Sequence, residues 1–390
     1  MSEKKGLARA REIYEDQASR ATELKAQGRK IIGYLCAYTP VEMMSAVGLV
    51  PYRIFGDMGE PVTQADRVLP VTFCPLVRSL FDLAFKGKYD FLDGMILVHS
   101  CDPQEKADRI WEYYIKHPFT HFIDMPVNID EQALKYFKGQ LRDFKEALEH
   151  FSGEELSSEK LNQAIELHNR QRASLRELYE LRKADPPLIS GTETLQVTKA
   201  LASLPVGEGN ELLTQVISEV RERKDGPQKK AARLLIWSAT LDNVDLMARF
   251  EVGANVVMDD YCGGSRACRK DVKLSDAPID ELAQHYLVDF NLPRTFRAAA
   301  FGETSKDYVT DLEIRFSYLK QYIKEWNVNG VVFLLVTACD PFAYELPLLK
   351  DYVDRIGVPS TYIEHDYTIG ALAPLTTRVE AFLEAISQEI

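Results

Sequence analysis

The sequence contains no run of about 18 apolar residues, the length that a membrane-spanning helix requires. Residues 1–17 are rich in charge and lack the apolar stretch of a secretory signal. We therefore expect a cytoplasmic protein with no membrane partner. In a reducing compartment the six cysteines are not expected to form disulfides, which leaves metal binding, catalysis or plain burial.

Several motifs with well-understood chemistry are also missing. The sequence has no CxxC pair, so zinc-ribbon and thioredoxin-like sites lose their usual support. Walker A, GxGxxG and HExxH patterns are absent, and so is GxSxG. We therefore do not expect this chain to bind ATP itself.

The sequence has fewer basic than acidic residues. Lys and Arg number 47 against 59 Asp and Glu, which gives a formal net charge of −12. A field of that sign repels the phosphates of nucleic acids and of anionic membranes, so we expect no nucleic-acid partner. With 390 residues, 46% of them hydrophobic and 27% charged, the composition is that of a globular protein with two domains.

Short apolar runs alternate with helical patterns in the first third of the chain, which predicts a parallel α/β sheet. The run 94–99 (GMILVH) is apolar almost throughout, as in a strand that is buried on both faces. Strands are predicted at 31–35, 49–55, 94–99 and 121–126, and helices at 3–29, 41–47, 76–87 and 105–116.

The same alternation resumes after residue 226, while the segment between has helical spacing. Strands are predicted at 234–237, 255–258, 330–336 and 359–363, and helices at 241–250, 306–325, 344–355 and 375–388. The predicted fold is α/β, with two Rossmann-like lobes whose parallel sheets are flanked by helices. Its parts are an N-terminal helix (1–29), a first lobe (30–130), a helical connecting segment (131–225) and a second lobe (226–390).

The cysteines share a position relative to the predicted strands. Cys36, Cys101, Cys262 and Cys339 come just after a strand, and Cys74 follows the weaker apolar run VLPVTF. Ligands of open parallel sheets bind at this carboxyl edge, so we expect cysteines from both lobes to face one cleft. Thiolates in such a cleft are suited to an iron–sulfur cluster.

The two lobes repeat one motif, Cys101-Asp102-Pro103 in the first and Cys339-Asp340-Pro341 in the second. This repetition favours a shared role over plain burial, although free cysteine often behaves as a small buried hydrophobe. Cys268 follows no predicted strand, and plain burial is the simpler interpretation for it.

Other polar residues lie beside the same strand ends. Glu42, Tyr38, His99 and Ser100 could donate a proton or bind a carbonyl oxygen. Each has a structural alternative, since an acid such as Glu42 also favours the first turn of a helix. Arg266 lies in the glycine-rich turn DDYCGGSR and is a candidate for contact with a substrate or other ligand.

In these segments the sequence resembles the 2-hydroxyacyl-CoA dehydratase / benzoyl-CoA reductase family. The ordered set of segments carries the resemblance: 33–57 (GYLCAYTPVEMMSAVGLVPYRIFGD), 73–79 (FCPLVRS), the Cys101-Asp102 turn, 259–266 (DDYCGGSR), 338–350 (ACDPFAYELPLLK) and 377–384 (TRVEAFLE). The resemblance implies two α/β lobes and a [4Fe-4S] cluster in the cleft between them, held by three cysteines that fall on Cys74, Cys101 and Cys339. It also implies a homologous second subunit, a separate ATP-hydrolysing iron–sulfur activator and an acyl-CoA substrate.

The resemblance leaves several branches open. The segments at 33–57 and around Cys101 look most like the smaller cluster-binding subunit of an ATP-dependent benzoyl-CoA reductase, which reduces the aromatic ring. A 2-hydroxyacyl-CoA dehydratase subunit would eliminate water through a ketyl radical. A third branch holds a double-cubane [8Fe-9S] cluster, for which Cys36, Cys262 and Cys268 would supply the additional ligands. From another class, a non-catalytic two-lobed binding or scaffold protein remains an alternative.

Overall fold

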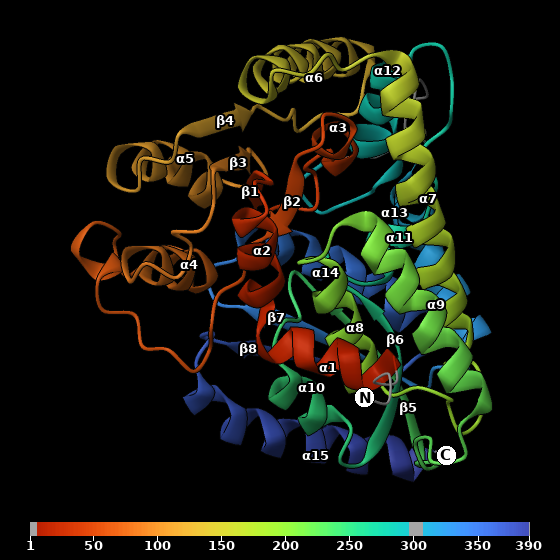
Figure 1. Ribbon diagram of the computed structural model, residues 1–390. Helices are drawn as coiled ribbons and strands as arrows, with labels where there is room; N and C mark the ends of the chain where they lie inside the picture. Colours follow the sequence, from red (N-terminus) through yellow and green to blue (C-terminus); the bar gives the residue numbers. More distant parts are fainter. Residues whose placement is uncertain (1–5, 296–306, 390) are drawn as a thin grey trace.

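The computed structural model describes residues 6–295 and 307–389, and its first lobe is a four-stranded parallel sheet in the order β2-β1-β3-β4 (Figure 1). The strands are β1 (Ile31–Tyr34), β2 (Val50–Arg53), β3 (Gly94–Val98) and β4 (Phe119–Ile123). The helical elements around them are α2 (Gln17–Ala26), α3 (Val41–Ala46), η1 (Ala65–Arg67), α4 (Pro75–Phe85) and α5 (Asp102–Tyr114). All five residues of β3 are buried, as the apolar run 94–99 predicts.

The second lobe is another parallel sheet, in the order β6-β5-β7-β8. Its strands are β5 (Ala232–Ser238), β6 (Ala254–Asp260), β7 (Gly330–Val336) and β8 (Ser360–His365). The helices of this lobe are α10 (Val244–Phe250), α11 (Ser265–Cys268), α13 (Tyr308–Glu325), α14 (Asp340–Arg355), η3 (Ile369–Ala371) and α15 (Leu372–Glu389). Alternate residues of β7 enter different cores: Phe333 packs with helices α13 and α14, and Leu334 with α10 and α15.

Long helices join the two lobes. They are α6 (Glu131–Ser152), α7 (Ser158–Glu180), α8 (Gly191–Leu201) and α9 (Val206–Glu222), with α12 (Pro278–Gln284) and the π-helical turn η2 (His285–Asp289) packed nearby. Helix α7 runs along the side of both lobes (Figure 1). Ser157 caps the start of α7, and Ser190 forms a capping box with Glu193 at the start of α8. None of the described helices is both long and apolar enough to cross a membrane.

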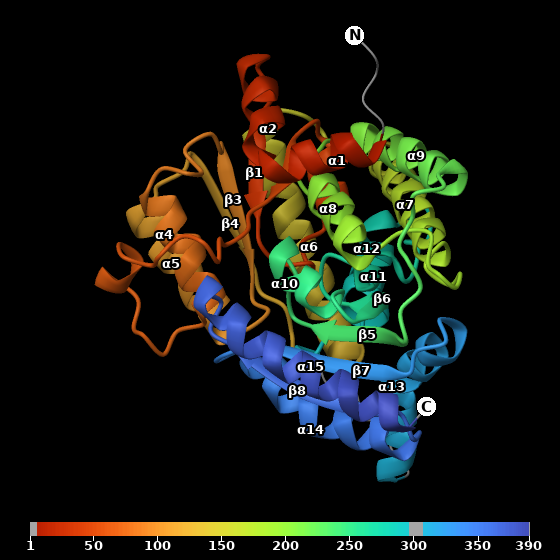
Figure 2. The same cartoon turned by 90° about the horizontal axis from the view of Figure 1, so that it is seen from below.

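The predicted two-lobed α/β fold is confirmed, but the single N-terminal helix is wrong. Two helices, α1 (Gly6–Glu15) and α2, meet at Asp16, whose φ of −134° is not helical. They separate because they pack on different partners: α1 lies against α8 and α9, and α2 against β1 (Figure 2). A side chain at Gly6 would come within 2.6 Å of the Val216 backbone nitrogen, so the absence of one permits the close approach of α1 to α9. Residues 1–5 of the predicted helix and residue 306 of helix 306–325 lie outside the described residues.

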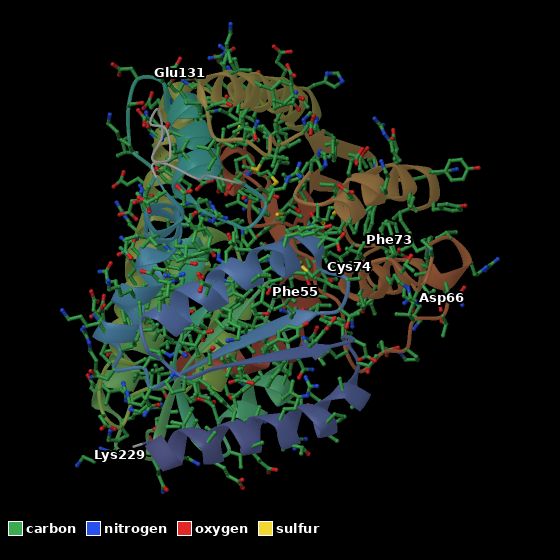
Figure 3. All side chains as sticks on the ribbon, turned by 180° about the vertical axis from the view of Figure 1, so that it is seen from behind. Phe55, Asp66, Phe73, Cys74, Glu131 and Lys229 are labelled. Atoms are coloured by element: carbon green, nitrogen blue, oxygen red, sulfur yellow. The ribbon has the colours of Figure 1, made fainter. Side chains whose placement is uncertain are left out.

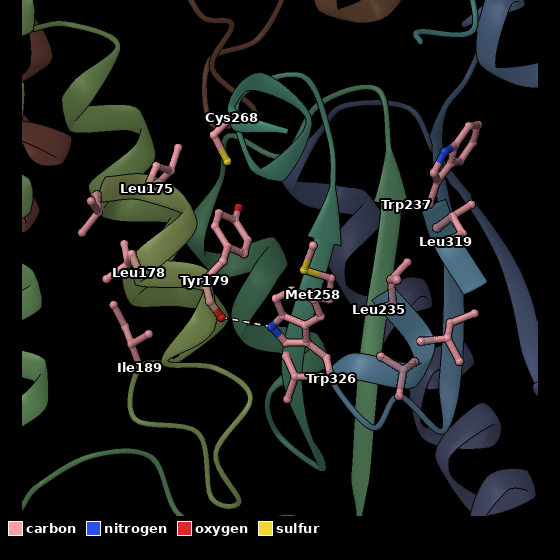
Figure 4. Packing of buried hydrophobic residues seen from close by; sticks show 14 of the residues in the cluster. Leu175, Leu178, Tyr179, Ile189, Leu235, Trp237, Met258, Cys268, Leu319 and Trp326 are labelled. Carbon is pink, nitrogen blue, oxygen red and sulfur yellow. Dashed lines mark hydrogen bonds between the residues drawn. The ribbon is translucent and has the colours of Figure 1, made fainter. Parts of the chain in front are cut away.

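The connecting helices are tied to the second lobe by a large core and by a buried ion pair. The indole nitrogen of Trp326 donates to the carbonyl of Tyr179 at the end of α7 (3.0 Å), within a cluster of apolar side chains (Figure 4). Just beyond α7, Arg182 Nη1 lies 2.6 Å from Asp259 Oδ2 on β6, and both side chains are almost completely buried. Such a pair is costly to break because one charge is left alone in the interior.

Replacing Arg182 by Met is therefore expected to lower the free energy of unfolding by about 3–5 kcal/mol, measured by urea denaturation. The matched control is Arg170→Met on α7, whose side chain is 65% exposed and pairs with Glu166 one turn away. That change is expected to cost less than about 0.5 kcal/mol. Equal effects of the two substitutions would contradict a structural role for the buried pair.

A second buried pair ties the first lobe to α7. Glu42 on α3 is 0% exposed and pairs with Arg172, while the hydroxyl of Tyr286 donates to its other oxygen (2.8 Å). Burial alone would raise the pKa of Glu42, but Arg172 and His168 outweigh it and lower the pKa to about 2. Because the carboxylate form is favoured in the fold, its contribution to stability is present above the ordinary pKa of 4.5 and is lost as the pH falls toward 2.

We therefore expect the difference in unfolding free energy between wild type and Glu42→Gln to shrink as the pH falls from about 4.5 to about 2. Urea denaturation of both proteins at several pH values measures this difference. A constant difference across that range would show that Glu42 is not held as a carboxylate.

Candidate functional site

Three cysteines begin three helices. Cys74, Cys101 and Cys339 are the N-cap residues of α4, α5 and α14, and each is followed by proline at one of the first two helical positions. Proline is favoured there because its missing N–H is not needed in the first turn. Cysteine is not among the preferred N-cap residues, so its use at three helix starts indicates a role other than capping.

The electrostatics of the three thiols follow from this position. Burial is the main effect and raises the pKa of each thiol, to about 12 for Cys101. Neighbouring cysteines add to the rise for Cys101 and Cys339. N–H groups in the first turn of each helix lower the thiol pKa, although none forms a full capping hydrogen bond. They belong to Leu76 and Val77 in α4, Gln104 in α5 and Phe342 in α14.

Five of the six cysteines line one cavity of about 110 Å³ between the lobes. The first lobe contributes three and the second lobe two: Cys36, Cys74, Cys101, Cys262 and Cys339. This cysteine cavity is also bounded by Tyr38, Ser100 and Arg294. Burial, followed by the nearby Cys262, raises the pKa of Cys36 to about 11.

Cys74 reaches the cavity by a route that the sequence prediction misses. The run VLPVTF before it is not a strand; it lies in the loop between η1 and α4. Figure 3 shows Cys74 near the middle of the molecule, while Asp66 in η1 lies toward the outer edge. The signal in the sequence is Pro75, which marks a helix start at Cys74 rather than a strand end.

Cys268 is not part of this group. It ends the short helix α11, is 2% exposed, and its thiol donates to the carbonyl of Ser265 (3.3 Å). Figure 4 shows it with Leu175 and Tyr179 at one end of the core cluster, where burial raises its pKa to about 12. The interpretation of Cys268 as a buried side chain agrees with this position.

Two other candidates, Glu42 and Arg266, lie in buried ion pairs, and Arg266 Nη1 also donates to the Cys262 sulfur (3.7 Å). Arg266 is 1% exposed and binds Asp260 (3.0 Å), which also binds Arg269 (2.9 Å). Among the described residues, neither Arg266 nor Glu42 lines the cysteine cavity. Each side chain neutralises a buried partner, and the predictions that Arg266 contacts a ligand and that Glu42 donates a proton stay predictions.

His99 and Ser100 lie at the end of β3, beside Cys101. Ser100 lines the cavity, and its hydroxyl interacts with the Cys36 sulfur. His99 is turned toward Asp124, with 2.7 Å between Nδ1 and Oδ1. Its ring, Asp102 and Glu105 offer ligand atoms within 4.8 Å of one another, an exposed grouping that is common without a metal ion.

A second and larger cavity, the α13–α14 chamber, adjoins the cysteine cavity. Its volume is about 630 Å³, and its lining includes Cys101, Arg294 and Pro341, which also line the cysteine cavity. Sequence reasoning misses Arg294, because it lies in no motif and is brought to the cavity only by the packing of the two lobes.

Comparisons with known proteins cover nearly the whole chain. A family model described as "2-hydroxyglutaryl-CoA dehydratase, D-component" matches residues 36–386. One of the benzoyl-CoA reductase subunits of Thauera aromatica is 25% identical, over 97% of each chain. The (R)-phenyllactyl-CoA dehydratase beta subunit of Clostridium sporogenes is 26% identical over 93% of each chain.

A further relative is the (R)-2-hydroxyglutaryl-CoA dehydratase subunit beta of Acidaminococcus fermentans, 24% identical over 93% of this chain and 94% of its own. The resemblance that the sequence segments indicate is thus confirmed across nearly the whole chain. This protein belongs to the family described as 2-hydroxyglutaryl-CoA dehydratase, D-component.

Proposed function

We propose that this chain is the iron–sulfur subunit of an ATP-dependent, low-potential acyl-CoA reductase of the benzoyl-CoA reductase type. The family and its named members place the chain, more broadly, among the subunits of acyl-CoA dehydratases and reductases, enzymes of the lyase or oxidoreductase type. The observation that carries the proposal is the meeting of Cys74, Cys101 and Cys339 at one cavity.

The donor set fits a [4Fe-4S] cluster. In the proposal, Cys74, Cys101 and Cys339 hold the cluster, which would supply one-electron transfer at low potential. First-turn N–H groups of three helices lie near these sulfurs and partly offset the effect of burial on their charge. Cys74 is buried, and Cys101 and Cys339 are partly buried, which limits the access of water to the site.

A double-cubane cluster would require more thiols than these three. Cys36 and Cys262 line the same cavity, but Cys268 lies in the apolar core. This supports one cubane over two. The dehydratase branch remains a second candidate, because dehydratase beta subunits match the chain at the same level of identity as the reductase subunit.

The proposal includes three partners. The named relatives are subunits of larger enzymes, which supports a partner subunit, and we infer that it is homologous to this chain. A separate ATP-hydrolysing iron–sulfur activator would deliver the electrons, since this sequence has no Walker A motif. The substrate would be an acyl-CoA thioester.

Substitution of single cysteines tests the ligand set. We expect Cys74→Ser, Cys101→Ser and Cys339→Ser each to lose most of the iron, measured on protein purified without oxygen together with its partner subunit. The matched control is Cys268→Ser, because it removes a buried thiol that lies outside the cavity.

The variants also separate the alternatives. Loss of iron from Cys268→Ser as well would favour the double-cubane cluster. Full iron in Cys101→Ser or Cys339→Ser would refute the three-cysteine set. A scaffold protein would lose neither iron nor activity in any of these variants.

A further inference from the structure

The α13–α14 chamber has the size of a small-molecule site. Its volume of about 630 Å³ falls within the roughly 300–1,000 Å³ that is common for such sites. The first lobe contributes Cys101 and Val127, and the second contributes side chains of α13 and α14. Because Cys101 and Arg294 border both cavities, a molecule in the chamber would lie beside the cysteine site.

Among the described residues, two arginines line the chamber, and of these only Arg294 has N–H donors without a hydrogen-bond partner. Arg315 binds Glu345 through Nε (2.6 Å), and its other nitrogens bind Asn291 Oδ1 (2.7 Å) and the Leu292 carbonyl (2.8 Å). Arg294 makes one hydrogen bond that is resolved among the described residues, from Nη2 to the Met125 carbonyl (3.2 Å).

The Nε of Arg294 is buried and has no hydrogen-bond partner within the described part of the chain. A guanidinium carries five N–H donors, and a buried donor without an acceptor is unfavourable. Because the Nε has almost no accessible surface, a molecule in the chamber would place an oxygen against the Nη groups of Arg294 instead.

The remaining walls indicate what kind of molecule fits. Leu312, Phe316 and Leu348 form an apolar side that suits an aliphatic or aromatic group. Asp102 and Asp340, at the first positions of α5 and α14, add negative charge to the lining. These carboxylates would repel the phosphates of CoA, so the nucleotide would remain outside the chamber.

We propose that the α13–α14 chamber receives the uncharged acyl group of a CoA thioester, and that Arg294 donates a hydrogen bond to the thioester oxygen. This inference rests on the proposed function and narrows its acyl-CoA substrate to one whose acyl group carries no charge. An acyl group with its own carboxylate is excluded, because Arg315 is already neutralised by Glu345 and the carboxylates of the lining repel a second negative charge.

Binding measurements test the proposal without relying on turnover. Dissociation constants are measured for benzoyl-CoA, glutaryl-CoA and free CoA, on anaerobic protein that contains this chain and its partner subunit. Substitutions in this chain alone separate its chamber from any site on the partner. We expect benzoyl-CoA to bind more tightly than glutaryl-CoA.

Arg294→Gln is expected to weaken benzoyl-CoA about ten- to a hundredfold, the usual effect of losing a charged hydrogen-bond donor, and to leave free CoA unchanged. The matched control is Arg109→Gln on α5, which removes the same charge from a side chain that is 79% exposed. A second variant, Val127→Trp, changes a side chain that is 43% exposed and fills the chamber without changing its charge. It is expected to weaken benzoyl-CoA as well.

Three results would overturn the proposal: an equal loss for benzoyl-CoA and free CoA in Arg294→Gln, no loss in either chamber variant, or tighter binding of glutaryl-CoA. Iron is measured in the same samples. Wild-type protein without iron would refute the proposed function. Protein that contains iron but binds benzoyl-CoA equally well with and without the substitutions would refute the chamber alone.

Discussion

The structure depends on the convergence of three helix N-termini, from both lobes, on one buried cavity. Cys74, Cys101 and Cys339 stand at these N-termini, so the two sheets must present their carboxyl edges to each other for the sulfurs to meet. The long helix α7 fixes that orientation through buried ion pairs with both lobes. Glu42 of the first lobe pairs with Arg172 on α7, and Asp259 of the second lobe pairs with Arg182 just after α7. The polar groups that sequence reasoning assigns to chemistry are thus partly used to hold the lobes in place.

The sequence predicts the features that depend on neighbours along the chain. Continuous apolar runs identify the strands, and the Cys-Asp-Pro turns identify two of the three helix starts, because strand, turn and helix follow one another directly. Features that depend on distant neighbours are not predictable in this way. Asp16 interrupts a sequence with good helical propensity because α1 and α2 pack on different partners. Arg266 forms an ion pair with Asp260 because a local turn brings the two side chains together. The unpaired N–H donors of Arg294 can be recognised only in the folded structure, where the loop after β4 and helix α14 lie beside it.

In the proposed function the two cavities have different roles. The cysteine cavity is small, apolar and lined with thiols, which suits a cluster that exchanges electrons. The neighbouring chamber is larger, and Arg294 stands between the two. An acyl group in that chamber would be held close to the source of electrons while its charged carrier stays outside. The relatives include both reductase and dehydratase subunits, and the proposed arrangement of cavities would suit either reaction.

The central claim is that this chain holds an iron–sulfur cluster, and the iron and acid-labile sulfide content of the wild-type protein tests it most directly. The measurement requires protein that has been purified without exposure to oxygen, because low-potential clusters are readily oxidised. We predict about four iron and four sulfide ions per chain, the content of one cubane. About eight irons would indicate the double-cubane cluster instead. No iron in protein that has never met oxygen would contradict the account.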